Sequence, residues 1–125
     1  MSRVATRIQP LVRDNVAMSD WTELLERFRR GPEILAAALT GAAGAEVDWA
    51  PAGKWNVRQI AAHMADSEIM ISARMRSIIA ENNPTLPAYD QDAWAANLGY
   101  EKRRPSESLE LFRRLRAANF SLLSD

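Results

Sequence analysis

The strongest constraint on the fold lies in residues 57–81, where large apolar side chains return every three or four positions. That spacing is the period of an α-helix and places these side chains on one face. Asn56 before the segment and Gln59 three residues later have the spacing of a capping box, and Pro84 stops the helix at its other end. We therefore expect a helix whose apolar face is covered by other helices. That face comprises Val57, Ile60, Ala61, Met64, Ile71, Met75 and Ile78.

Two further segments have the same helical period. The first begins near Ser19 or Asp20, either of which can cap it, and contains Gly31-Pro32 in its middle. Because proline removes one helical hydrogen bond, we expect a kink or a short interruption there. The other begins near Pro105 and carries no stop signal before the end of the sequence. No stretch alternates as a strand does, so the sequence predicts an all-α bundle of about three long helices. We assign this domain to residues 18–125, with a flexible extension over residues 1–17.

Two segments between the helices are expected to be mostly irregular. Glycine and proline punctuate residues 40–55, which predicts a loop from which Trp49 and Trp55 fold back as apolar lids on the core. Residues 83–104 are also expected to be irregular, apart from a short helix around Trp94 that Asp90 or Asp92 caps.

Charge and composition exclude several kinds of protein. Sixteen basic residues balance sixteen acidic ones, so no net field attracts nucleic acid or an anionic membrane. There is no cysteine, which rules out disulfides and thiolate chemistry. No apolar run reaches the roughly 20 residues that a membrane span needs. We expect a cytoplasmic protein that binds neither nucleic acid nor membrane.

His63 is the one histidine of the sequence. At about 100° per residue it lies about 60° to the side of Ile60, on a border of the apolar face that Ser67 and Arg74 share. An imidazole turned partly inward can bind a metal or simply make a hydrogen bond, and both interpretations stay open. Ser67 lies one turn away and can meet His63, but that border lacks the orienting acid and the oxyanion hole of a serine nucleophile. Asp66 points well away from the apolar face.

Three other polar residues lie on or inside apolar faces. Glu68 sits on the opposite border from His63 and can be a general base or the partner of an arginine, with pairing favoured. Arg116 and Asn119 interrupt the apolar face of the last helix. Because buried polar groups need partners, we expect both to bond across to Glu68 or to a loop carbonyl. A structural role is favoured over substrate binding.

A longer motif surrounds His63. Residues 54–68 read KWNVRQIAAHMADSE and resemble the helix start W-S-V-x-x-I-x-x-H-L-x-D-x-E of the DinB/YfiT-like superfamily. The resemblance extends over residues 20–125. It is carried further by Gly31-Pro32, Asp48-Trp49-x-Pro51, Arg74-x-Arg76-x-Ile78, Pro84-Thr85-Leu86-Pro87-x-Tyr89-Asp90, Trp94 and Leu115-Arg116-Ala117-Ala118-Asn119.

This resemblance implies a four-helix bundle that holds a divalent metal, often zinc or nickel, on three histidines. His63 matches the first of these ligands. The other two form an H-x-x-x-H pair on a final helix that this sequence does not contain. Members of the family include metal-dependent hydrolases and thiol-dependent transferases or isomerases.

The missing histidines set two expectations. One histidine cannot hold a catalytic metal, so we expect a DinB-like enzyme that lacks its last helix and, as this chain alone, binds no metal and is inactive. The alternative is a non-catalytic helical homodimer or interaction module that retains the scaffold. A bundle without one helix exposes apolar side chains, which favours a homodimer with residues 57–81 and 105–125 at or near the interface.

Overall fold

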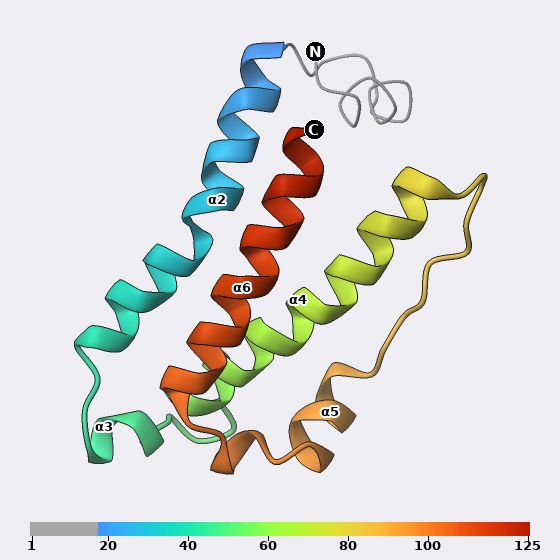
Figure 1. Ribbon diagram of the computed structural model, residues 1–125. Helices are drawn as coiled ribbons and strands as arrows, with labels where there is room; N and C mark the ends of the chain where they lie inside the picture. Colours follow the sequence, from blue (N-terminus) through green and yellow to red (C-terminus); the bar gives the residue numbers. More distant parts are fainter. Residues whose placement is uncertain (1–17) are drawn as a thin grey trace.

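The computed structural model describes residues 18–125, which form three long helices joined through shorter helical turns (Figure 1). No strand occurs in this range, so the all-α prediction is confirmed. The expected extension over residues 1–17 lies outside the described residues. The long helices are α2 (Met18–Thr40), α4 (Val57–Ala80) and α6 (Pro105–Ser124); the short elements are α3 (Ala45–Asp48), α5 (Gln91–Asn97) and the 3-10 turn η2 (Tyr100–Lys102).

The last long helix is the central one. Figure 1 shows α6 lying between α2 and α4, and α6 makes extensive contacts with both. The short elements gather at the end of the molecule where α4 begins, with η2 packed on both α4 and α5. None of the helices in residues 18–125 combines the length and the apolarity that crossing a membrane requires.

The helix starts follow local sequence signals. Asn56 Oδ1 accepts a hydrogen bond from the Gln59 amide at 2.9 Å, and Gln59 Oε1 accepts one from the Asn56 amide at 3.0 Å. This is the predicted capping box of α4. Asp90 Oδ1 accepts from the Ala93 amide at 3.0 Å and caps α5, which confirms the short helix expected around Trp94. Both starts are therefore fixed by bonds within a few residues.

Helix α2 continues through Gly31-Pro32 without interruption. Figure 1 shows that its axis changes direction near the middle, so the outcome is a bend within one helix. Pro32 is buried there and has no amide hydrogen, which leaves the carbonyl of Phe28, four residues earlier, without its helical donor. The partner that this carbonyl finds is described below.

The buried face of α4 differs from the predicted stripe. The most buried positions are three alanines with no exposed surface, whereas Ile60 and Ile69 are each 43% exposed. The prediction was wrong for Ile60 and right for Ala61, because α4 is covered by α6 and by η2, and small side chains let both approach closely. The other large apolar members of the predicted face are half-buried: Val57, Met64, Ile71, Met75 and Ile78. The buried alanines are Ala61, Ala62 and Ala65.

A compact apolar cluster closes the end of the molecule at the start of α4. Ala62, Ala95 and Tyr100 are buried in it, and Trp55 and Trp94 pack against them. The lid role predicted for Trp55 is confirmed. The same prediction for Trp49 was wrong, because this side chain at the end of α3 is 69% exposed.

Candidate functional site

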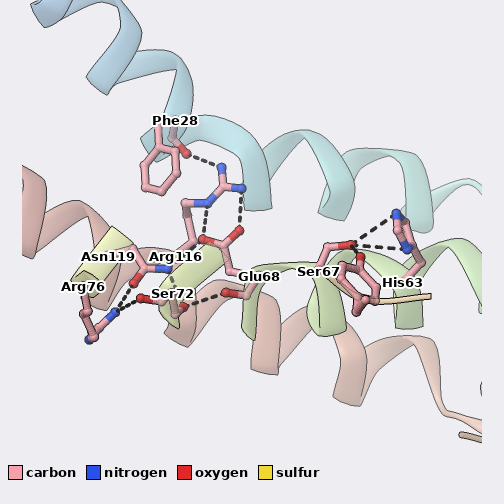
Figure 2. A network of polar contacts seen from close by, with 9 residues as sticks. Phe28, His63, Ser67, Glu68, Ser72, Arg76, Arg116 and Asn119 are labelled. Atoms are coloured by element: carbon pink, nitrogen blue, oxygen red, sulfur yellow. Dashed lines mark hydrogen bonds and ion pairs between the residues drawn. The ribbon is translucent and has the colours of Figure 1, made fainter. Parts of the chain in front are cut away.

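His63 lies on the second turn of α4 between an aromatic ring and two hydroxyl groups. The ring centroid of Trp55 is 5.1 Å from that of His63, with the two planes tilted by 55°. Ser67 Oγ is 3.3 Å from each ring nitrogen of His63 and 2.8 Å from the hydroxyl of Tyr89. Figure 2 shows the Ser67 hydroxyl directed at the imidazole. The predicted contact between Ser67 and His63 is therefore present.

The environment of His63 favours the neutral form of its imidazole. Burial lowers the pKa of His63 below its ordinary value of 6.5, and the negative charge of Asp66 opposes this only in part. A neutral imidazole has one N–H donor and one nitrogen lone pair, which is the form that binds metal ions. The hydroxyl of Ser67 can occupy one of these positions, because it can donate or accept. One nitrogen of His63 is then left to a ligand.

Tyr89 is a member of this group that sequence reasoning missed. The pattern placed it in a loop but gave no sign that the loop returns to α4. Arg74, on the same border as His63, holds the loop in place, because its Nε donates a hydrogen bond to the Pro87 carbonyl at 2.8 Å. The Tyr89 ring also packs on Trp94, at a centroid distance of 4.4 Å. The extended segment before α5 thus places the hydroxyl of Tyr89 next to Ser67.

Asp66 follows His63 by three residues on α4 and is paired with Arg103, at the end of η2. It is 4% exposed, and its Oδ1 accepts a hydrogen bond from Arg103 Nη1 at 2.7 Å. The Tyr100 hydroxyl and Asp66 Oδ2 are both buried and make no hydrogen bond with the described residues. Burial raises the pKa of Tyr100, and the nearby negative charge of Asp66 raises it further. Asp66 was predicted to point well away from the apolar face of α4; the structure instead buries it, because η2 and Arg103 cover this side of the helix.

Glu68 is held by α6 and not by the site around His63. Its side chain is 1% exposed, and it accepts hydrogen bonds from Arg116 Nε at 2.9 Å and Nη2 at 2.8 Å. Asn119 Nδ2 donates to the same carboxylate at 2.9 Å (Figure 2). Asn119 also bonds to Ser72 at 2.7 Å and to Arg76 at 2.9 Å. The predicted pairing of Arg116 and Asn119 with Glu68 is confirmed, and the carboxylate is not free to act as a base beside His63.

The donor set around His63 does not make a complete metal site. A catalytic zinc site takes three protein ligands and leaves one position open. Within residues 18–125 no three histidine, cysteine, aspartate or glutamate side chains lie close enough together to hold a metal ion. Asp66 and Glu68, the nearest carboxylates in the sequence, are bound to Arg103 and Arg116. The chain therefore offers one imidazole and no second strong ligand beside it.

Most of the chain matches the sequence model of one known family. The sequence model of the DinB superfamily matches residues 27–125. The chain belongs to the DinB superfamily. The family expectation that rested on residues 54–68 is thereby confirmed.

Several members of the DinB superfamily resemble this chain. OB0782 of Oceanobacillus iheyensis is 31% identical over 113 residues, which are 89% of this chain and 63% of that protein. YfiT of Bacillus subtilis is 34% identical over 71 residues, which are 57% of this chain and 40% of that protein. Both carry the name "Putative metal-dependent hydrolase". The chain spans less than two thirds of the length of these curated relatives.

A solved structure of YfiT matches the fold directly. It superimposes with a TM-score of 0.83 at 26% sequence identity, over 90% of this chain and 65% of YfiT. That protein is described as a probable metal-dependent hydrolase with an unusual four-helix bundle topology. The long helices of this chain are therefore arranged as in a DinB-superfamily bundle, which confirms the predicted fold class.

Proposed function

We propose that this chain is part of a metal-dependent enzyme of the hydrolase class and that His63 is the ligand it contributes to a divalent metal site. The observation that carries the proposal is the neutral, half-buried imidazole of His63, which has Ser67 at one side and Trp55 at the other. The names of its DinB-superfamily relatives and the likeness to YfiT support the class. Zinc or nickel suits an imidazole ligand. A thiol-dependent transfer reaction is the other chemistry that the family resemblance allows.

The remaining ligands would have to approach from the open side of α4. His63 lies close to the side of α4 on which Ile60 remains 43% exposed, away from the alanine face that packs on α6. We propose that the 125 residues alone hold too few ligands for catalysis and have neither hydrolase nor transferase activity. In this proposal a complete site forms only with ligands from outside these 125 residues or from another copy of the chain.

Metal analysis of the purified chain tests the role of His63. Zinc or nickel is added to the chain and bound metal is measured by equilibrium dialysis, beside His63→Ala and Ser67→Ala variants. Weak binding that is lost in His63→Ala and kept in Ser67→Ala supports His63 as a single ligand. Binding near one metal per chain that survives His63→Ala would show that the metal lies elsewhere and would overturn the proposal.

A specific observation also favours the non-catalytic alternative, in which two copies associate. Large apolar side chains are exposed on all three long helices, and such surfaces commonly mark interfaces. We propose in this case a homodimer that covers parts of α4 and α6. The exposed residues on the three helices are Leu24, Ile34, Ile60, Ile69 and Leu111.

Light scattering coupled to gel filtration tests the dimer. At micromolar concentration we expect a dimer that Ile60→Glu or Leu111→Glu dissociates, because each variant places a charge in the apolar interface. Ile34→Glu is the matched control, since Ile34 is 67% exposed on α2 and lies outside the proposed interface. A native chain that remains monomeric, or a dimer that only Ile34→Glu dissociates, argues against this interface.

A further inference from the structure

The bend of α2 contains a carbonyl group that its own helix cannot satisfy. Pro32 lies inside α2 and has no N–H to donate to the carbonyl of Phe28, four residues earlier. Pro32 is buried, so it occupies the packed side of α2. A helical carbonyl in such a place needs a donor from outside the helix.

Arg116 of α6 supplies that donor. Its Nη1 donates a hydrogen bond to the Phe28 carbonyl at 2.8 Å (Figure 2). The same guanidinium carbon lies 4.0 Å from the centroid of the Phe28 ring and 4.8 Å from that of Phe112. The arginine thus satisfies the carbonyl while its charge rests between two aromatic rings.

Glu68 of α4 orients the guanidinium of Arg116 that contacts α2. Glu68 accepts from Arg116 Nε and Nη2, which leaves Nη1 for the Phe28 carbonyl. Such paired contacts fix the plane of the group as well as its position. Glu68 therefore determines where a donor meets α2, although no hydrogen bond or ion pair joins Glu68 itself to that helix.

Gly31 leaves the room for this approach. A Cβ atom at position 31 would lie 2.5 Å from Arg116 Nη1 and 3.4 Å from its guanidinium carbon. The end of an arginine normally moves aside easily, but here two carboxylate oxygens and a carbonyl hold it. Any side chain at position 31 must therefore break at least one of these bonds.

We propose that Gly31, Pro32 and Arg116 form a latch in which Arg116 gives the Phe28 carbonyl the hydrogen bond that Pro32 removes, through the space that Gly31 leaves. The latch fixes the bend of α2 against α6 and, through Glu68, against α4. It is a conformational device separate from the proposed metal ligand, His63. In the sequence, Gly31-Pro32 within a helix and Arg116 within an apolar face are separate features. In the structure they contact each other.

The latch predicts that Gly31→Ala costs more stability in the native chain than in a background without Arg116. Pro32 disfavours a helical alanine directly before it, so a moderate fall in the folding equilibrium constant is expected in any background. In the native chain we expect at least a tenfold further fall, because the new methyl group displaces Arg116. In a Glu68→Gln/Arg116→Met background the guanidinium is absent, and this further fall should disappear. Urea unfolding followed by circular dichroism gives both values.

Ala37→Gly is the matched control, since Ala37 is exposed on the same helix. It should lower the folding constant by about fivefold in both backgrounds. A fall of the same size for Gly31→Ala in the two backgrounds overturns the latch.

Hydrogen exchange keeps the test decisive if the double variant does not fold. The Nε–H of Arg116 is measured by NMR in the native chain, in Gly31→Ala and in Ala37→Gly. We expect at least tenfold faster exchange in Gly31→Ala and no such change in the control. Equal protection in Gly31→Ala and the native chain would overturn the proposal.

Discussion

Neutralising Glu68 should remove a large share of the stability of this domain. Glu68→Gln keeps the shape of the side chain and an oxygen for Asn119, but it leaves the buried guanidinium of Arg116 without a counter-charge. Breaking a buried ion pair on one side costs about 3–5 kcal/mol. A domain of this size has about 5–15 kcal/mol in all. With a urea m value of about 1.5 kcal/mol/M, the unfolding midpoint should fall by about 2–3 M.

Removing Arg116 should cost more stability than neutralising Glu68. Arg116→Met also removes the donor to the Phe28 carbonyl, and an unsatisfied buried acceptor costs about 1–3 kcal/mol. We therefore expect Arg116→Met to be less stable than Glu68→Gln by about that amount. The double variant Glu68→Gln/Arg116→Met buries no lone charge and should be more stable than Arg116→Met.

Urea unfolding of the single and double variants, followed by far-ultraviolet circular dichroism, measures these differences. The control is Glu110→Gln, because Glu110 pairs with Arg113 and Arg114 on the surface and its removal should leave the unfolding midpoint almost unchanged. Costs that add in the double variant, or a Glu68→Gln cost no larger than that of the control, would refute the reasoning.

Three smaller perturbations test other parts of the structure. Asn56→Ala removes the capping box of α4 and should cost about 1 kcal/mol in urea unfolding; an unchanged midpoint would mean that the cap contributes nothing. Tyr100→Phe removes a buried hydroxyl without a partner and should stabilise the domain by up to about 1 kcal/mol, whereas a loss of stability would show that the hydroxyl donates to Asp66. The imidazole of His63 should titrate below pH 6.5 by NMR. Because the unfolded chain then binds more protons than the folded one, stability should fall as the pH drops from about 7 through that range, and His63→Gln should lack this component of the fall.

Sequence reasoning succeeded where the signal is local or where few partners are possible. The cap at Asn56 depends on residues within one turn, so the pattern alone predicts it. The pairing of Arg116 with Glu68 was foreseen for a different reason. A charged group inside an apolar face must find an opposite charge or a carbonyl, and this chain offers few of either in such positions.

Sequence reasoning failed where the burial or the contacts of a residue depend on segments that are distant in the sequence. Most of the buried alanine face of α4 was missed because hydrophobicity ranks isoleucine above alanine, whereas the close packing of α6 and η2 on α4 selects for small size. The burial of Asp66 depends on η2, a short turn 34 residues further on that has no periodic signal of its own. Tyr89 escaped notice because the path of a loop cannot be read from its composition.

The central place of α6 has a consequence for how the chain acquires its structure. Helices α2 and α4 both pack on α6, yet α6 is the last of the described helices to be synthesised. The bond from Arg116 to Phe28 closes a loop of 88 residues, and that to Glu68 a loop of 48. Contacts this distant in sequence slow folding relative to bundles whose neighbouring helices pair in order. On the ribosome, the faces of α2 and α4 that pack on α6 therefore stay uncovered until residues 105–124 emerge, and such exposed apolar surface makes an incomplete chain prone to aggregation.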